Sequence, residues 1–192
     1  QGIKASEQTQ NLRRLLNAGL VIRDHGLHLY LFSLPDLYNR DSLLDFDEKN
    51  PEEHELVHDA FAVKEVGNQL SIFAGGRSVH APSPTVGGFI NTPDQAKVQS
   101  LIAQLREIRP RVLKVIKIFK DCAFTHEEDF AYAALQAESR YDYLNGHIVS
   151  SDGKKIPAQE YGNHLEHTII PYSQASGYKF DGQIYMVGAL AR

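Results

Sequence analysis

Apolar residues recur at steps of three and four positions through long stretches of this chain, and that spacing constrains the fold more than any other feature of the sequence. One run covers residues 6–35 and opens on a serine that suits a helix N-cap. Another covers residues 98–119 and keeps its period across Pro110, which predicts a kinked helix or two nearly collinear helices. Between these runs, Pro51 suits the first turn of a helix over residues 52–69. The sequence therefore predicts a mainly α-helical, multi-helix bundle.

Shorter elements are expected in the last third of the chain. Residues 147–156 predict a β-hairpin, because their central Asp-Gly pair is typical of a two-residue type I′ turn. Helices are expected over residues 127–140 and 158–170, and a second Asp-Gly pair, at 181–182, is expected to lead into a short C-terminal strand. The fold class expected is thus a helical bundle with a small β-hairpin and a short C-terminal strand, organised as a single domain over residues 1–192.

Residues 74–89 follow neither the helical nor the strand pattern. Two glycine pairs bracket Arg77, His80 and two prolines. Glycine permits backbone shapes and close approaches that other residues cannot make, whereas proline fixes φ and removes a hydrogen-bond donor. The segment therefore predicts a rigid loop that presents Arg77 and His80. The alternative is an ordinary cluster of surface turns.

This loop and two other stretches carry a family resemblance. Gly-Gly-Arg-x-x-His, followed by a proline and then by Gly-Gly-Phe, resembles the glycine-rich histidine loop of nickel–iron hydrogenase large subunits, although Ala81 stands where that family usually has proline. Residues 24–36 resemble the family's helix with His-x-x-His-Phe-Tyr before Leu-Pro-Asp. Residues 185–192 resemble its Tyr-x-Val-Gly-Ala-Leu-Ala-Arg segment. The three matches occur in family order across nearly the whole chain.

The resemblance implies a chemistry for the complete subunit. Members of that family split or form dihydrogen at a nickel–iron centre, which four cysteines hold in two Cys-x-x-Cys pairs. This chain has one cysteine, Cys122. We therefore predict that no catalytic, metal-binding or cofactor-binding residue lies in this span. The expected role is the central scaffold of a longer large subunit, inactive alone, from which this chain is an excised part.

The resemblance also implies where the loop points. In the family this loop faces the iron–sulfur small subunit, close to a cluster. The predicted partner-facing residues are Gly76, Arg77, His80, Gly87 and Gly88. A cation and an imidazole suit that place, because both donate hydrogen bonds towards cluster sulfurs and so raise the cluster's potential.

Two histidines on the first predicted helix have two interpretations. His25 and His28 are three residues apart and so lie roughly on one helical face. Either they bind metal or relay protons, as residues behind the main metal ligands would, or they are packing histidines. The packing interpretation is favoured, because imidazole is often buried without a chemical role.

A different class of function follows from His54-Glu55-Leu56-Val57-His58, a His-Glu-x-x-His pattern. On a helix this pattern places two imidazoles on one face with a glutamate beside them, as in zinc peptidases. His54 and His58 would then be zinc ligands, and Glu65 or His80 would supply a third. The competing interpretation is an amphipathic helix whose apolar stripe packs in the core.

Two further alternatives concern metals. Glu160, His164 and His167 would share a face if residues 158–170 were helical, which would allow a metal site in a bundle, although surface polar residues are favoured there. The chain would also fit a metal-free relative that keeps the fold and serves as a structural or assembly subunit.

Charge and hydropathy argue against two classes of partner. The net charge of −4 gives no general attraction to nucleic acid. No apolar run approaches the roughly 20 residues of a membrane span, and the first residues lack the apolar core of a signal peptide. With a single cysteine, these features predict a cytoplasmic protein with no nucleic-acid or membrane partner. The basic residues of 98–119 and the acidic residues of 37–50 are expected on solvated faces.

Overall fold

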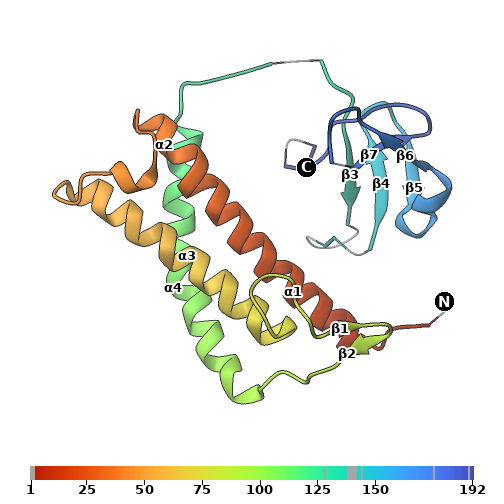
Figure 1. Ribbon diagram of the computed structural model, residues 1–192, viewed down its shortest axis with the longest axis horizontal. Coiled ribbons are helices and arrows are strands. Elements are labelled where there is room, and N and C mark those ends of the chain that lie inside the picture. The colour runs from red at the N-terminus through yellow and green to blue at the C-terminus, as the bar shows by residue number, and fades with distance from the viewer. Residues whose placement is uncertain (1–2, 128, 138–141, 144, 175, 190) are drawn as a thin grey trace. The chain divides into compact units, whose positions relative to one another are not determined.

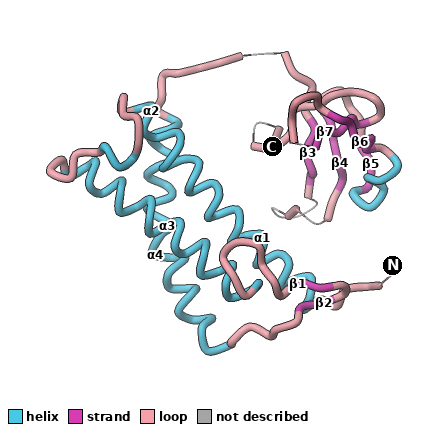
Figure 2. Tube along the Cα trace, viewed as in Figure 1, coloured by secondary structure: helices cyan, strands magenta, loops and turns pink. Residues whose placement is uncertain are grey.

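The computed structural model describes residues 3–127, 129–137, 142–143, 145–174, 176–189 and 191–192. The chain forms two compact units, Gln1–Phe124 and Thr125–Arg192. The long helices belong to the first unit, and strands dominate the second (Figures 1 and 2). The mainly helical fold class with small antiparallel sheets is confirmed, whereas the single domain over residues 1–192 stays a prediction.

Helix α1 (Glu7–Gly26) begins where the sequence indicates. The side chain of Ser6 accepts a hydrogen bond from the Thr9 amide at 3.2 Å, which satisfies one of the free amides of the first turn. After Gly26 the chain continues without a break as a π-helical segment, Leu27–Ser33, and then as the short helix α2 (Leu34–Leu37). The helix predicted over residues 6–35 is therefore confirmed, with a change of winding that the apolar spacing does not indicate.

Helix α3 (Pro51–Gly75) packs along α1 at close range. Glycines make this approach possible. A Cβ atom on Gly67 would lie 2.6 Å from the Arg23 backbone nitrogen, and one on Gly19 would lie 2.6 Å from the Ser71 Oγ. Neither position has room for a side chain, so the backbones of the two helices lie against each other.

Helix α4 (Val98–Lys120) is one helix with Pro110 inside it. A 3₁₀ turn, Gln95–Lys97, precedes it and is capped by the Asp94 side chain. The core of this unit lies between α4, α3 and the π-helical segment. Its buried apolar side chains include Tyr30, Leu34, Leu43, Phe46, Leu56, Ala60, Val63, Ile108 and Val115. Among the described residues, no helix is long and apolar enough to cross a membrane.

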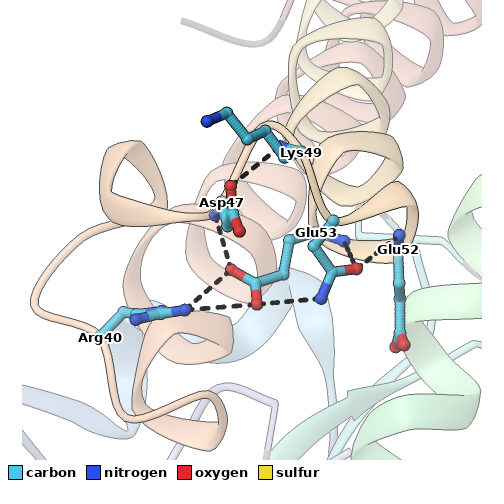
Figure 3. Close-up of polar contacts among 6 residues, drawn as sticks. Arg40, Asp47, Lys49, Glu52 and Glu53 are labelled. Atoms are coloured by element: carbon cyan, nitrogen blue, oxygen red, sulfur yellow. Dashed lines mark hydrogen bonds and ion pairs between the residues drawn. The ribbon is translucent and has the colours of Figure 1, made fainter.

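The solvated loop expected over residues 37–50 is wrong in part. Leu43 and Phe46 are 2% and 5% exposed and belong to the core, around a 3₁₀ turn at Leu43–Asp45. The carboxylate of Glu53, which is 8% exposed, accepts hydrogen bonds from the Asp47 amide at 2.7 Å and from Arg40 at 3.3 Å (Figure 3). The acidic sequence hides this arrangement, because the anchor lies outside the loop, on the first turn of α3.

In the second unit, β3 (Ala133–Gln136), β4 (His147–Ser150) and β5 (Lys155–Pro157) form an antiparallel sheet in that order. The hairpin predicted over residues 147–156 is thus confirmed. The type I′ turn predicted for this hairpin is wrong. Gly153 has a φ of +93°, but Asp152 is not in the left-handed region, which a type I′ turn requires of both central residues. The Gly153 amide donates to the Ser150 carbonyl at 3.1 Å instead.

The second Asp-Gly pair makes the turn that was expected at the first. Strand β6 (Leu165–Ile169) pairs with β7 (Ser176–Phe180) in an antiparallel sheet. Asp181 and Gly182 follow β7 with φ values of 48° and 78°, and Phe180 and Gln183 exchange two backbone hydrogen bonds across them. The short C-terminal strand therefore precedes this turn rather than following it.

The predictions of helices over residues 127–140 and 158–170, in the second unit, are both wrong. Ala133–Gln136, within the predicted helix at 127–140, is strand β3, and residues 128 and 138–140 lie outside the described part of the chain. Residues 158–170 form a 3₁₀ helix, Ala158–Asn163, followed by β6. Helical spacing is a local signal, whereas these strands depend on backbone partners in β4 and β7.

Candidate functional site

The glycine-rich loop begins where α3 ends. Gly76 has a φ of 86°, and its amide donates to the Ile72 carbonyl at 2.8 Å, which closes the last turn of the helix. A Cβ atom at Gly76 would lie 3.2 Å from the Ser83 Oγ. Glycine is therefore needed here for both its conformation and its size.

Arg77 holds the loop from within. Its Nε donates to the Val79 carbonyl at 2.7 Å, and its Nη2 donates to the His80 carbonyl at 2.9 Å. A second arginine, Arg23 of α1, donates to the Ser78 carbonyl. Three successive carbonyls are thus bound by guanidinium groups, so the path of the loop is fixed on both sides.

His80 has an uncommon backbone conformation. Its φ is 51°, a region that residues other than glycine seldom adopt and that costs about 1–3 kcal/mol. The residue is exposed, while Ser83, three positions on, is 2% exposed and accepts a hydrogen bond from Asn91. A strained residue carrying an exposed imidazole on a well-anchored loop is typical of a functional position.

A small antiparallel ribbon completes the loop, with β1 (Pro84–Thr85) paired to β2 (Gly88–Phe89). Gly87 turns the ribbon with a φ of 77°, and its carbonyl lies 3.5 Å from the Thr9 hydroxyl of α1. Nothing lies within 4 Å of the position of a Cβ on Gly88, so packing does not explain that glycine. Apolar side chains are exposed on the loop and just after the ribbon: Val79 at 45%, Val86 at 64% and Ile90 at 71%.

Known proteins match this chain along nearly its whole length. The chain is 28% identical over 194 residues to sulfhydrogenase 1 subunit alpha of Pyrococcus furiosus, a match that covers 100% of this chain and 45% of that protein. The chain is a homologue of nickel–iron hydrogenase large subunits. It spans about half the length of the curated relatives it matches and corresponds to a central segment of them. No family model matches it.

Solved hydrogenases share the fold. The chain is 17% identical, with a TM-score of 0.68, to an NAD+-reducing [NiFe]-hydrogenase, over 92% of this chain and 44% of that one. It is 18% identical, with a TM-score of 0.67, to the Ni-Fe-Se hydrogenase from D. vulgaris Hildenborough, over 100% of this chain and 50% of that one. The family resemblance predicted from the three motifs is therefore confirmed.

The other histidines of the hydrogenase-like motifs lie apart from the loop in the sequence. His25 is half-buried near the end of α1, and His28 is exposed in the π-helical segment, where its Nε2 lies 3.3 Å from the Ser33 hydroxyl. The two residues belong to segments of different winding, so the shared α-helical face assumed for them does not apply. Their role behind a metal site stays a prediction.

His54 and His58 lie one turn apart on α3, with ring centroids 4.4 Å apart. The group beside them is Glu48, whose carboxylate lies 2.6 Å from the His54 Nδ1, rather than the Glu65 or His80 that the sequence suggested. All three are exposed, which differs from the enclosed cleft of a peptidase. Glu65 instead accepts a hydrogen bond from Gln69 at 2.5 Å.

Glu55, the base of the peptidase hypothesis, has another partner. Its carboxylate lies 2.7 Å from the Lys114 Nζ of α4. The hydrogen bond and charge of Lys114 lower the pKa of Glu55. A glutamate held as a carboxylate by an ammonium group is a poorer base, so this geometry does not support a hydrolytic role.

The predicted face of Glu160, His164 and His167 does not form. Glu160 is in the 3₁₀ helix, whereas His167 is in β6 and packs against the Tyr178 ring at 5.4 Å. The His164 Nδ1 lies 2.8 Å from the Asp181 carboxylate. The bundle metal site is therefore wrong, because it required a helix over residues 158–170.

A buried ion pair was missed by sequence reasoning. Asp59 of α3 is 1% exposed, and its Oδ1 accepts from Arg111 of α4 at 2.7 Å. The Arg111 carbonyl accepts from the Tyr30 hydroxyl at 2.9 Å, and burial, followed by the Asp59 charge, raises the pKa of Tyr30. The prediction that the basic residues of 98–119 lie on a solvated face is therefore wrong for Arg111. Its side chain is about one-third exposed and is bonded to Asp59. One signal was available, since Asp59 falls three residues after Leu56 in the apolar stripe.

Proposed function

We propose that this chain is the central scaffold of a hydrogenase large subunit and that it supplies no ligand to the nickel–iron centre. The observation that carries the proposal is the match to a hydrogenase alpha subunit along the whole of this chain. The donor set supports it. The single thiol, Cys122, accepts a hydrogen bond from the Phe124 amide at 3.4 Å, and one thiolate does not fit a centre that the family holds with four.

The glycine-rich loop is proposed to dock on the iron–sulfur small subunit. The Arg77 guanidinium donates hydrogen bonds to two carbonyls of the loop itself. It therefore positions the loop rather than reaching across an interface. His80 supplies the exposed imidazole, and Val79, Val86 and Ile90 supply exposed apolar surface on the loop and just after the ribbon. An apolar patch with a few directed donors is typical of a protein interface.

Co-purification tests the docking proposal. In the complete large subunit, Val86→Asp combined with Ile90→Asp places two charges on the proposed patch, and we expect at least about a tenfold loss of small subunit recovered with it. Leu44→Asp is the matched control, because Leu44 is 77% exposed but lies in the loop before α3. Equal recovery of the small subunit with the double variant and the control would overturn the proposal.

Metal analysis tests the scaffold proposal separately. The purified 192-residue chain is expected to carry no stoichiometric nickel with iron. Stoichiometric nickel together with iron would show that ligands other than cysteine pairs hold the centre, and the scaffold proposal would fail.

A further inference from the structure

The His-Glu-x-x-His stretch is not used by the scaffold function, yet it lies in an organised group of ligands. One ligand atom from each of Glu48, His54 and His58 lies within 4.8 Å of the other two. We propose that these three side chains form a surface site for a divalent transition metal of the zinc type. The site is independent of the nickel–iron centre and of the docking loop.

The ligand set suits such an ion. Two neutral imidazoles and one carboxylate form a borderline donor set that zinc accepts, with the fourth position left to water. Zinc ligands at about 2.0–2.2 Å from the ion lie about 3.3 Å from one another in a tetrahedral site. The His54 Nδ1 and a Glu48 carboxylate oxygen are 2.6 Å apart in a hydrogen bond, which an ion between them would replace, and the three ligand atoms lie within 4.8 Å of one another.

The loop that carries Glu48 is held in place from both sides. The Asp47 amide donates to the buried Glu53 carboxylate at 2.7 Å, and the Lys49 amide donates to the Asp47 carboxylate at 2.9 Å (Figure 3). Arg40 also bonds to Glu53. Glu48 therefore lies between two residues whose amides are fixed, next to the helix turn that carries His54. This arrangement lowers the entropy cost of bringing the third ligand to the ion.

The electrostatics of the helix end also favour a cation. The N-terminus of a helix carries partial positive charge, which alone would repel a metal ion. Glu52 stands in the first turn of α3 and offsets it, whereas the charge of Glu53 is paired with Arg40. Glu55 is paired with Lys114, so it neither joins the ligands nor acts as a base beside them. The arrangement favours metal binding without hydrolysis.

Zinc titration of the purified chain by calorimetry near neutral pH tests the site. We expect one strong site, weakened by at least about tenfold in His54→Ala and in His58→Ala, since the loss of even an outer partner typically costs 10–100-fold. Glu48→Gln is expected to weaken the site as well, because it removes the anionic ligand. Tetrahedral cobalt absorption bands should appear in the wild-type protein and vanish in His58→Ala.

His25→Ala and His28→Ala are the matched controls, because they remove histidines three residues apart elsewhere in the same unit. Zinc affinity should be unchanged in both, and circular dichroism of each variant checks that the helices persist. Undiminished zinc binding in the His54→Ala, His58→Ala double variant would overturn the site. Full affinity in Glu48→Gln would overturn the three-ligand arrangement. Neither result bears on the scaffold function, which predicts nothing about zinc.

Discussion

The two units of this chain hold themselves together differently. In the helical unit, apolar side chains from the π-helical segment, α2, α3, α4 and the loop before α3 are buried together, and Leu34, Leu56 and Ala60 are each 0% exposed. In the β unit, the buried apolar side chains among the described residues are Ala133 and Phe180, while Ile169 and Ile184 are 85% and 78% exposed. The helical unit is therefore stabilised mainly by its own core, and the β unit presents apolar surface instead.

Turns and polar contacts take the place of a core in the β unit. The Tyr185 hydroxyl donates to the Asp152 carboxylate at 2.6 Å, which joins the C-terminal family motif to the hairpin. Lys154 lies over the rings of Phe180 and Tyr185 at 5.1 Å and 5.2 Å. Such contacts fix geometry but contribute little net stability at an exposed surface.

The largest expected change in stability comes from truncating a core side chain of the helical unit, and the same truncation in the β unit is the comparison. Leu56→Ala removes a fully buried side chain from the helical core and should lower the free energy of unfolding by about 2–5 kcal/mol. Ile169→Ala removes an exposed side chain of the β unit and should change it by no more than about 0.5 kcal/mol. Denaturant unfolding followed by circular dichroism measures both. A comparable loss from Ile169→Ala would mean that the β unit has a core of its own at that position.

The buried ion pair gives the next effect. Arg111→Ala leaves the Asp59 carboxylate buried, with Lys114 at 3.7 Å as its remaining ion-pair partner among the described residues, and should lower the free energy of unfolding by about 2–4 kcal/mol. Arg106→Ala, an exposed arginine on the same helix, is the control and should cost less than about 0.5 kcal/mol. The double variant Asp59→Leu, Arg111→Met should recover most of the loss, because it removes both charges. Failure of the double variant to recover would show that the pair itself, and not an orphaned charge, sets the stability.

Two glycine substitutions test the close contact between α1 and α3. Gly67→Ala forces a methyl group to within 2.6 Å of the Arg23 backbone and should destabilise the helical unit by about 1–3 kcal/mol. Gly162→Ala adds the same group where nothing lies within 4 Å, and the thermal midpoint should be unchanged. Equal midpoints for the two variants would show that α1 and α3 have room to move apart.

The smallest effect depends on pH. Lys114 lowers the pKa of Glu55, so this carboxylate contributes stability above its ordinary pKa and loses that contribution as pH falls through its lower folded value. Wild-type protein should thus be slightly more stable than Glu55→Gln at neutral pH, and the difference should disappear in acid. Urea midpoints across the acid range measure this, with Glu160→Gln of the β unit as control. A difference that persists in acid would contradict the ion pair.

The sequence predicts elements whose signals are local. The apolar period, the Ser6 cap and Pro51 place the long helices, and three short motifs identify the family. It fails where partners distant in the sequence decide. Residues 133–136 and 165–169 fit a helical pattern but form hydrogen bonds with neighbouring strands. The two Asp-Gly pairs adopt different turns although their amino-acid sequence is the same.

The candidate sites divide in the same way. The loop residues were predicted because glycine and proline dictate local backbone shape, and Gly76 and Gly87 do have positive φ. The roles of Glu48 and Asp59 were not predicted, because each side chain bonds to a residue on another element: Glu48 to His54 and Asp59 to Arg111. The π-helical winding after Gly26 leaves no distinct trace in the apolar spacing.

Arg23 joins two features of the helical unit in one residue. Its backbone lies against Gly67 of α3, and its side chain, which is 12% exposed, bonds to the Ser78 carbonyl of the glycine-rich loop. The separation of the two helices and the path of the loop are therefore mechanically coupled. If the glycine-rich loop docks on the small subunit as proposed, substitutions in the helix interior will alter that docking without changing a residue of the loop itself.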